Sequence, residues 1–119
     1  MQGRGFIFAA AVAKMTGKGF IPIRKSGKLP AASFSESYAL EYGEGILQIH
    51  QDAVLTGERV MVIDDVLATG GTLGAAVKLI GRSGGVVDCV AVLMEISGLG
   101  GQQKFSETNP SLEISILLN

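Results

Sequence analysis

The sequence predicts an α/β fold in which a mostly parallel sheet is flanked by helices. The first observation is that Val60–Ile63 is apolar without alternation, which is typical of a strand buried on both faces. The second is that a helical pattern over Gly71–Arg82 separates this run from another apolar run, Val86–Met94. Strands that alternate with helices indicate a parallel sheet, and ligands of such sheets bind at the carboxyl ends of the strands.

The other expected elements are shorter. Leu29–Tyr42 has a mixed pattern that favours a β-excursion with a mobile tip, and Ile46–His50 alternates as an edge strand does. We further expect a helix over Phe6–Met15 that ends at Gly17, a strand over Gly19–Ile23, a flexible loop over Gly98–Gly101, a helical turn over Gln102–Phe105 and a last strand over Ile114–Leu118.

The composition fits one soluble domain over residues 1–119. A net charge of −1 gives no electrostatic case for nucleic-acid binding, and no apolar run reaches the length of a membrane span. The single cysteine, Cys89, excludes an internal disulfide and is compatible with a reducing compartment. We therefore expect a cytoplasmic protein with no nucleic-acid or membrane partner, in which Cys89 is an inert core thiol.

A pair of carboxylates and a small-residue turn follow the Val60–Ile63 run. In the turn Ala68-Thr69-Gly70-Gly71-Thr72, missing side chains let backbone N–H groups approach an anion, and the helix that follows aims its N-terminal dipole at that anion. Asp64 and Asp65 would repel a phosphate, so they make sense facing sugar hydroxyls or a bridging cation such as Mg²⁺. The ligand class inferred is a sugar phosphate.

The whole stretch from Val60 to Thr72 resembles the phosphoribosyl-diphosphate (PRPP) motif of the type I phosphoribosyltransferases. The alternative is an ordinary strand–turn–helix junction, where Asp and Thr are common caps. The resemblance implies that the turn residues hold the 5′-phosphate: Ala68, Thr69, Gly70, Gly71 and Thr72. It also implies that Asp64 and Asp65 bind the ribose 2′- and 3′-hydroxyls, directly or through Mg²⁺ and water, with the metal held mainly by substrate and water.

Two basic segments stand before this motif. Gly3-Arg4-Gly5-Phe6 could be a frayed terminus, and the three cations of the segment 24–28 could be a solvated face. However, Arg-Gly-Phe-Ile-Phe resembles the pyrophosphate loop of the adenine phosphoribosyltransferases, although Ala9 stands where that branch often has Gly. Arg-Lys-x-Gly-Lys-Leu-Pro is similar to the adenine-specific branch as well. The resemblance implies that Arg4, Lys25 and Lys28 neutralise the departing pyrophosphate.

The polar segment 35–43 is the third candidate. Its composition alone favours an exposed β-hairpin with surface acids, or a flexible lid closed by Gly43. Leu40-Glu41-Tyr42-Gly43 resembles the catalytic loop of the family. The resemblance implies that Glu41 manages the proton of the incoming purine, and that Tyr38 and Tyr42 belong to the lid.

Together these resemblances imply transfer of a 5-phosphoribosyl group from PRPP to N9 of adenine, giving AMP and pyrophosphate. Members of the family are typically homodimers, so a homodimer is expected. Two alternatives stay open: a PRPP-binding regulatory module, and an inactive fragment that lacks base recognition.

The family has a longer segment before its Arg-Gly-Phe loop than this chain has. That segment carries the first core strand and an N-terminal hood over the base. In the family's sheet the strand lies between those that match Gly19–Ile23 and Val60–Ile63. We therefore expect a domain incomplete at its N-terminus, with a gap of about two strand spacings of ~4.8 Å.

Overall fold

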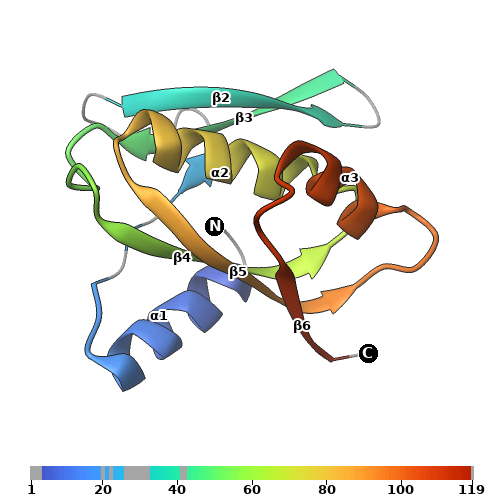
Figure 1. The fold of residues 1–119 in the computed structure, drawn as a ribbon, viewed down its shortest axis with the longest axis horizontal. Coiled ribbons are helices and arrows are strands. Elements are labelled where there is room, and N and C mark those ends of the chain that lie inside the picture. The colour runs from blue at the N-terminus through green and yellow to red at the C-terminus, as the bar shows by residue number, and fades with distance from the viewer. Residues whose placement is uncertain (1–3, 20, 22, 26–32, 41–42, 119) are drawn as a thin grey trace.

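A computed structural model describes residues 4–19, 21, 23–25, 33–40 and 43–118 of the chain. These residues form a parallel sheet, helices on both of its faces, and a separate antiparallel sheet over one helix (Figure 1). In chain order the elements are α1 (Arg4–Thr16), β1 (Arg24–Lys25), β2 (Ser33–Leu40), β3 (Gly43–His50), β4 (Arg59–Leu67), α2 (Gly71–Arg82), β5 (Val86–Glu95), α3 (Gly101–Thr108) and β6 (Ile114–Leu118).

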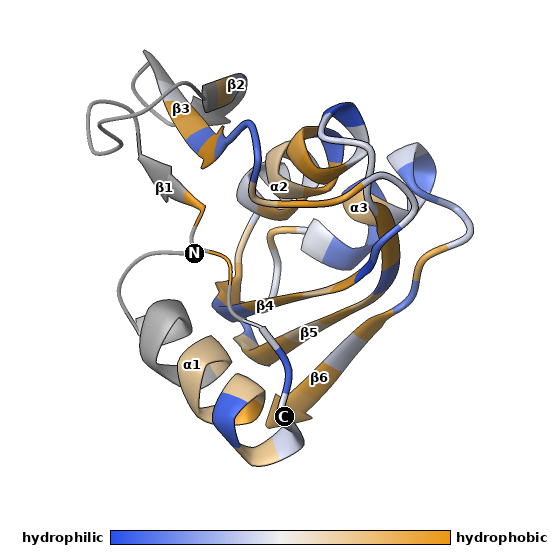
Figure 2. Cartoon of the chain, turned by 90° about the vertical axis from the view of Figure 1, so that its left-hand side faces the viewer, coloured by the Kyte–Doolittle hydropathy of each residue, from blue (hydrophilic) through white to orange (hydrophobic). Residues whose placement is uncertain are grey.

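The parallel sheet has the strand order β4-β5-β6. Val62 of β4 pairs with Val90 of β5, which in turn pairs with Ile114 of β6. Helices α2 and α3 lie on one side of this sheet and α1 on the other (Figure 2). The predicted α/β class is confirmed, and α2 has the bounds that the sequence pattern predicted.

The core lies between the parallel sheet, α2 and the antiparallel sheet. Ala76 and Leu79 of α2 are fully buried, as are Val90 on β5 and Ile49 on β3. Burying one such aliphatic side chain contributes about 1.5–3 kcal/mol, so α2 is held on both sides by apolar burial. No described helix is long and apolar enough to cross a membrane.

The antiparallel sheet has the order β1-β3-β2 and is built on the β2–β3 hairpin. The hairpin pairs Ser33 with His50 at its base and Leu40 with Gly43 near its tip. The predicted β-excursion is therefore present in its described part. The strand predicted at Ile46 begins earlier, at Gly43, and the expectation of an edge strand is wrong, because β3 pairs with β1 on one side and with β2 on the other. Its alternating pattern reflects one buried face, with Leu47 and Ile49 in the core.

The predicted strand over Gly19–Ile23 is wrong in its described residues, because Gly19, Ile21 and Ile23 lie outside any strand. The short strand β1 that follows joins the antiparallel sheet, where Arg24 pairs with Gln48. Within the described chain, β4 pairs with β5 alone. A strand needs a neighbour for its backbone hydrogen bonds, and Gly19, Ile21 and Ile23 pair with no described strand.

A cavity of about 610 Å³ lies along the unpaired side of β4. It is lined by residues of α1 such as Val12, by Ile21 and Ile23, and by Met61 and Ile63 of β4. Cys89 also lines the cavity and is only half-buried, so the expectation of a core thiol is wrong in that respect.

A matched pair of glycine substitutions tests the packing around α2. A Cβ at Gly81 meets nothing within 4 Å, whereas a Cβ at Gly85 would lie 2.6 Å from Val54 Cγ1 and 2.9 Å from Ile80 Cγ2. We expect Gly81→Ala to raise the free energy of unfolding by about 0.5–1 kcal/mol through helix propensity. Gly85→Ala should lower it by about 1–3 kcal/mol through overpacking. Urea titrations measure both, and shifts of the same sign would contradict this packing.

Candidate functional site

The two candidate carboxylates lie inside β4 rather than after it. The sequence pattern ended this strand at Ile63, but the strand continues to Leu67. Successive side chains of a strand point to opposite faces, so a ligand held by both Asp64 and Asp65 must lie around the carboxyl end of β4. Asp64 is buried, with 7% of its surface exposed, and Asp65 is half-buried.

Each carboxylate accepts a hydrogen bond from the next backbone amide. The Asp65 N–H donates to Asp64 Oδ1 at 2.9 Å, and the Val66 N–H donates to Asp65 Oδ1 at 2.8 Å. These local bonds fix the orientation of both side chains. They occupy one oxygen of each carboxylate, and the other is left with acceptor capacity for a hydroxyl or a cation.

Gly70 turns the chain from β4 into α2. Its backbone is left-handed, with φ 87° and ψ −5°, a conformation that favours glycine. No side chain caps the helix at this point. The first amides of α2 have no partner within the helix, so they are left for an anion or for water. The turn therefore has free amides at the start of α2, and its role in holding a phosphate stays a prediction.

Helix α3 supports this turn from outside, which the sequence analysis missed. Gly101, its first residue, is buried, and a Cβ there would collide with the Ala68 carbonyl oxygen. A Cβ at Gly70 would lie 2.9 Å from the Gly101 carbonyl oxygen, so the two glycines pack backbone against backbone. The only signal was the run Gly98–Gly101, which was interpreted as a flexible loop.

The β2–β3 hairpin reaches the same turn. Ser37 of β2 lines a cavity of about 340 Å³ together with Thr69, Gly70 and Gly71 of the turn. Two cations that sequence reasoning did not single out, Lys78 of α2 and Lys104 of α3, line it as well. The structure thus brings the predicted lid strand and the predicted phosphate turn together.

Several predicted site residues are placed only in part. Arg4 begins α1, Lys25 lies on β1 and Tyr38 lies on β2. For these three residues the structure describes the backbone element alone. Lys28, Glu41 and Tyr42 lie outside the described residues. Their roles stay predictions.

The two aspartates suit a hard cation only with help from other ligands. Across the described residues, no group of three His, Cys, Asp or Glu side chains could hold a metal ion. Carboxylate oxygens are ligands that Mg²⁺ accepts, and it usually keeps several waters and substrate oxygens in its shell. Any Mg²⁺ at Asp64 and Asp65 would complete its coordination in that way.

Burial raises the pKa of Asp64 from 3.8 to about 6. Desolvation is the largest cause, and the neighbouring Asp65 carboxylate adds to it; the hydrogen bond from the Asp65 N–H acts in the opposite direction. A carboxylate is therefore kept in a site where its charge is costly in the absence of a ligand.

The raised pKa of Asp64 predicts a pH-dependent stability. The folded state holds this proton more tightly than the unfolded state, so the stabilising contribution is present below about pH 4 and is lost as the pH rises to about 6. After a discount for solvent screening, we expect a loss of about 2 kcal/mol in the free energy of unfolding. Asp64→Asn should remove this loss and be the more stable protein at pH 7.5.

Urea titrations at pH 4.5 and 7.5 measure this effect. Asp88→Asn, which alters an exposed carboxylate on β5, serves as the control and should keep the wild-type pH dependence. An equal pH dependence in Asp64→Asn and wild type would contradict the assignment.

Comparison with known proteins gives a consistent result. Residues 2–109 match the phosphoribosyl transferase domain family. The adenine phosphoribosyltransferase of Pectobacterium atrosepticum is 55% identical over 106 residues, which cover 89% of this chain and 57% of that protein. The adenine phosphoribosyltransferase of Streptomyces clavuligerus is 52% identical over 118 residues, which cover 99% of this chain and 66% of that protein.

Solved structures agree with the sequence relatives. The adenine phosphoribosyltransferase of Thermoanaerobacter pseudethanolicus superposes with a TM-score of 0.90 at 47% identity, covering 98% of this chain and 66% of that one. The Saccharomyces cerevisiae enzyme, complexed with an imino-altritol bisphosphate and adenine, gives a TM-score of 0.90 at 34% identity, covering 98% and 64%. The chain thus spans between half and two thirds of the length of these relatives. The resemblance seen in the sequence is confirmed: the chain belongs to the phosphoribosyltransferase family, and its named relatives are adenine phosphoribosyltransferases.

Proposed function

We propose that this chain binds PRPP and transfers its 5-phosphoribosyl group to N9 of adenine, giving AMP and pyrophosphate. The observation that carries the proposal is the unit formed by buried Asp64, left-handed Gly70 and the uncapped start of α2. The ligands of solved relatives support it, since the Trypanosoma brucei enzyme was solved with AMP, pyrophosphate and ribose-5-phosphate.

Binding divides between the two parts of this unit. The backbone amides and hydroxyls of residues 68–72 hold the 5′-phosphate at the start of α2. Asp64 and Asp65 accept hydrogen bonds from the ribose 2′- and 3′-hydroxyls at the carboxyl end of β4. The phosphate and the sugar are thereby fixed at two points, which orients the anomeric carbon for attack.

The reaction exchanges one bond at the anomeric carbon for another. The bond from C1 to the pyrophosphate oxygen breaks, the bond from C1 to N9 forms, and the N9 proton passes to Glu41. Arg4, Lys25 and Lys28 stabilise the negative charge that grows on pyrophosphate. Asp64 and Asp65 would hold Mg²⁺ together with water and substrate oxygens, and the ion would supply positive charge that lowers the cost of the leaving pyrophosphate. The β2–β3 hairpin excludes water, which would otherwise hydrolyse PRPP.

A cytoplasmic location and a homodimeric state complete the proposal. The first is supported by the single cysteine, and both by the kinship with adenine phosphoribosyltransferases. Size-exclusion chromatography with light scattering tests the dimer.

Substitution of Gly70 tests the phosphate cradle. In Gly70→Ala, the added Cβ would lie too close to the Gly101 carbonyl oxygen. Alanine also disfavours the left-handed backbone of this position, so the turn must change shape. We expect the Kd for PRPP with Mg²⁺ to rise at least ~tenfold, measured by isothermal titration calorimetry. Gly81→Ala, on the exposed face of α2, should bind as wild type does. Equal affinity in Gly70→Ala and wild type would place the phosphate elsewhere.

Substitution of Glu41 tests the catalytic assignment. Glu41→Gln removes the proton acceptor, so we expect kcat for pyrophosphate release with adenine to fall ~10²–10⁴-fold. PRPP affinity should stay within about threefold of wild type, because the sugar-phosphate contacts are unchanged. Glu44→Gln, three residues on, is the matched control. A kcat for Glu41→Gln equal to that of Glu44→Gln would remove Glu41 from the mechanism.

A second candidate is a module that binds PRPP without transferring it. It rests on the same unit, because Asp64 and the turn at Gly70 account for binding of a sugar phosphate without any part in the transfer step. Calorimetric binding of PRPP by the wild-type chain, without pyrophosphate release on addition of adenine, would select this function over transfer. The absence of PRPP binding would reject both.

A further inference from the structure

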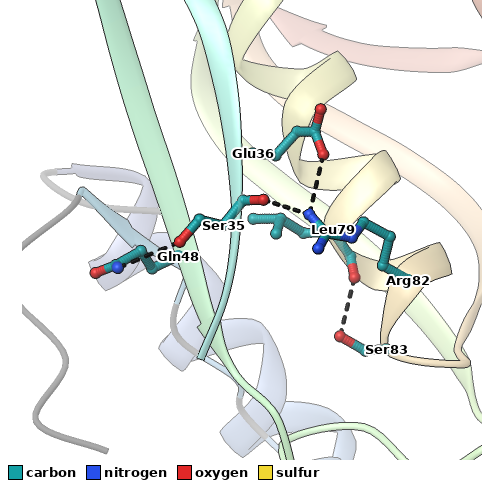
Figure 3. Close-up of polar contacts among 6 residues, drawn as sticks. All are labelled: Ser35, Glu36, Gln48, Leu79, Arg82 and Ser83. Carbon is teal, nitrogen blue, oxygen red and sulfur yellow. Dashed lines mark hydrogen bonds and ion pairs between the residues drawn. The ribbon is translucent and has the colours of Figure 1, made fainter. Parts of the chain in front are cut away.

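Arg82, the last residue of α2, contacts three successive residues of β2. Its Nη1 donates a hydrogen bond to the Ser35 carbonyl oxygen and lies 3.4 Å from Glu36 Oε2 (Figure 3). Its guanidinium carbon lies 5.4 Å from the centroid of the Phe34 ring. One side chain thus joins the end of a helix to the root of a hairpin more than 45 residues away in the sequence.

The contact is more than an exposed ion pair. Surface ion pairs by themselves contribute little, and the Arg82 side chain is half-exposed. However, the guanidinium also donates to a backbone carbonyl and stacks on a ring, and a planar donor fork suits both. The carbonyl belongs to the strand itself, so the bond fixes the backbone of β2 and not only a mobile side chain.

Both sides of the contact are held in place. Ser83 closes the helix end, because its Oγ donates to the Leu79 carbonyl oxygen at 2.9 Å (Figure 3). On the strand side, Gln48 of β3 donates to Ser35 Oγ at 3.3 Å. Ser35 is therefore bound through its carbonyl to α2 and through its hydroxyl to its hairpin partner.

The two ends of α2 serve the two halves of the candidate site. Its first residue, Gly71, follows Gly70 in the phosphate turn. Its last residue, Arg82, contacts Ser35 at the start of β2, which we call the root of the hairpin. From that root the strand runs past Ser37, which lines the cavity beside the turn, toward the hairpin tip. A shift of the root would move the hairpin relative to the turn.

We propose that Arg82 is a positioning residue, which sets the β2–β3 hairpin over the phosphate turn. We call the contacts of Arg82 with Phe34, Ser35 and Glu36 the clamp. The structure shows these contacts directly, whereas their effect on turnover rests on the proposed function. Arg82 touches no reacting atom and acts through Ser35 and Glu36.

Hydrogen–deuterium exchange tests the clamp without any need for activity. In Arg82→Ala we expect the amides of residues 33–40 and 43–50 to exchange roughly tenfold faster, with α2 and the parallel sheet unchanged. Arg59→Ala is the matched control: it removes another exposed arginine ion pair, 2.8 Å from Asp88, which joins β4 to β5 and not to the hairpin. Hairpin exchange within about twofold of wild type, or a uniform rise across the whole chain, would overturn the proposal.

Two further variants separate charge from geometry. Arg82→Lys keeps the charge facing Glu36 but loses the planar fork, so we expect hairpin exchange between wild type and Arg82→Ala. This variant decides the question if Arg82→Ala does not fold. Glu36→Gln keeps the carbonyl bond and the ring contact, and should change exchange by no more than about twofold. A larger effect in Glu36→Gln than in Arg82→Lys would contradict the proposal.

Kinetics of the same variants test the consequence for turnover. With PRPP, Mg²⁺ and adenine, Arg82→Ala should lower kcat roughly tenfold while the Kd for PRPP stays within about threefold, because the turn is untouched. A wild-type chain without turnover would reject the transfer function and leave the exchange result to decide the clamp. Wild-type turnover with an unchanged kcat in Arg82→Ala would reject the positioning role.

Discussion

The left-handed turn at Gly70 is the constraint on which the rest of the candidate site depends. It ends β4, begins α2 and packs against the backbone of Gly101, so three elements meet where no side chain fits. Because the turn is this tight, the amides at the start of α2 come close to the carboxyl end of β4. The aspartates of the strand and the uncapped start of the helix are thereby brought within reach of one small ligand.

The burial of Asp64 shows that this arrangement costs stability. None of the lysines and arginines whose side chains the structure describes forms a salt bridge with it, and desolvation raises its pKa to about 6. A residue selected for stability alone would be apolar here, as its neighbours Val62 and Ile63 are. An unfavourable buried charge of this kind is retained where ligand binding offsets the stability that it costs. The stability lost in the free chain is therefore an argument for binding at this point.

Local patterns predicted some elements well and others poorly, for a physical reason. The bounds of α2 were predicted because apolar periodicity and flanking glycines are properties of the segment itself. Gly19–Ile23 was mispredicted because a strand depends on a partner, and none lies beside it among the described residues. The packing of Gly101 against Ala68 could not be predicted from the sequence either, since a run of glycines before a helix has the same pattern whether it is exposed or buried.

Sequence patterns also could not reveal the role of Arg82. Its main partner is the carbonyl of Ser35, and a backbone atom leaves no trace in a sequence. At 1.5 Å per residue, the 12 residues of α2 separate its ends by about 18 Å. One residue more or less would rotate the last turn by about 100° relative to the first. With Gly70 fixed at one end, Arg82 would then point away from β2, so the length of the helix sets the distance between the phosphate turn and the root of the hairpin.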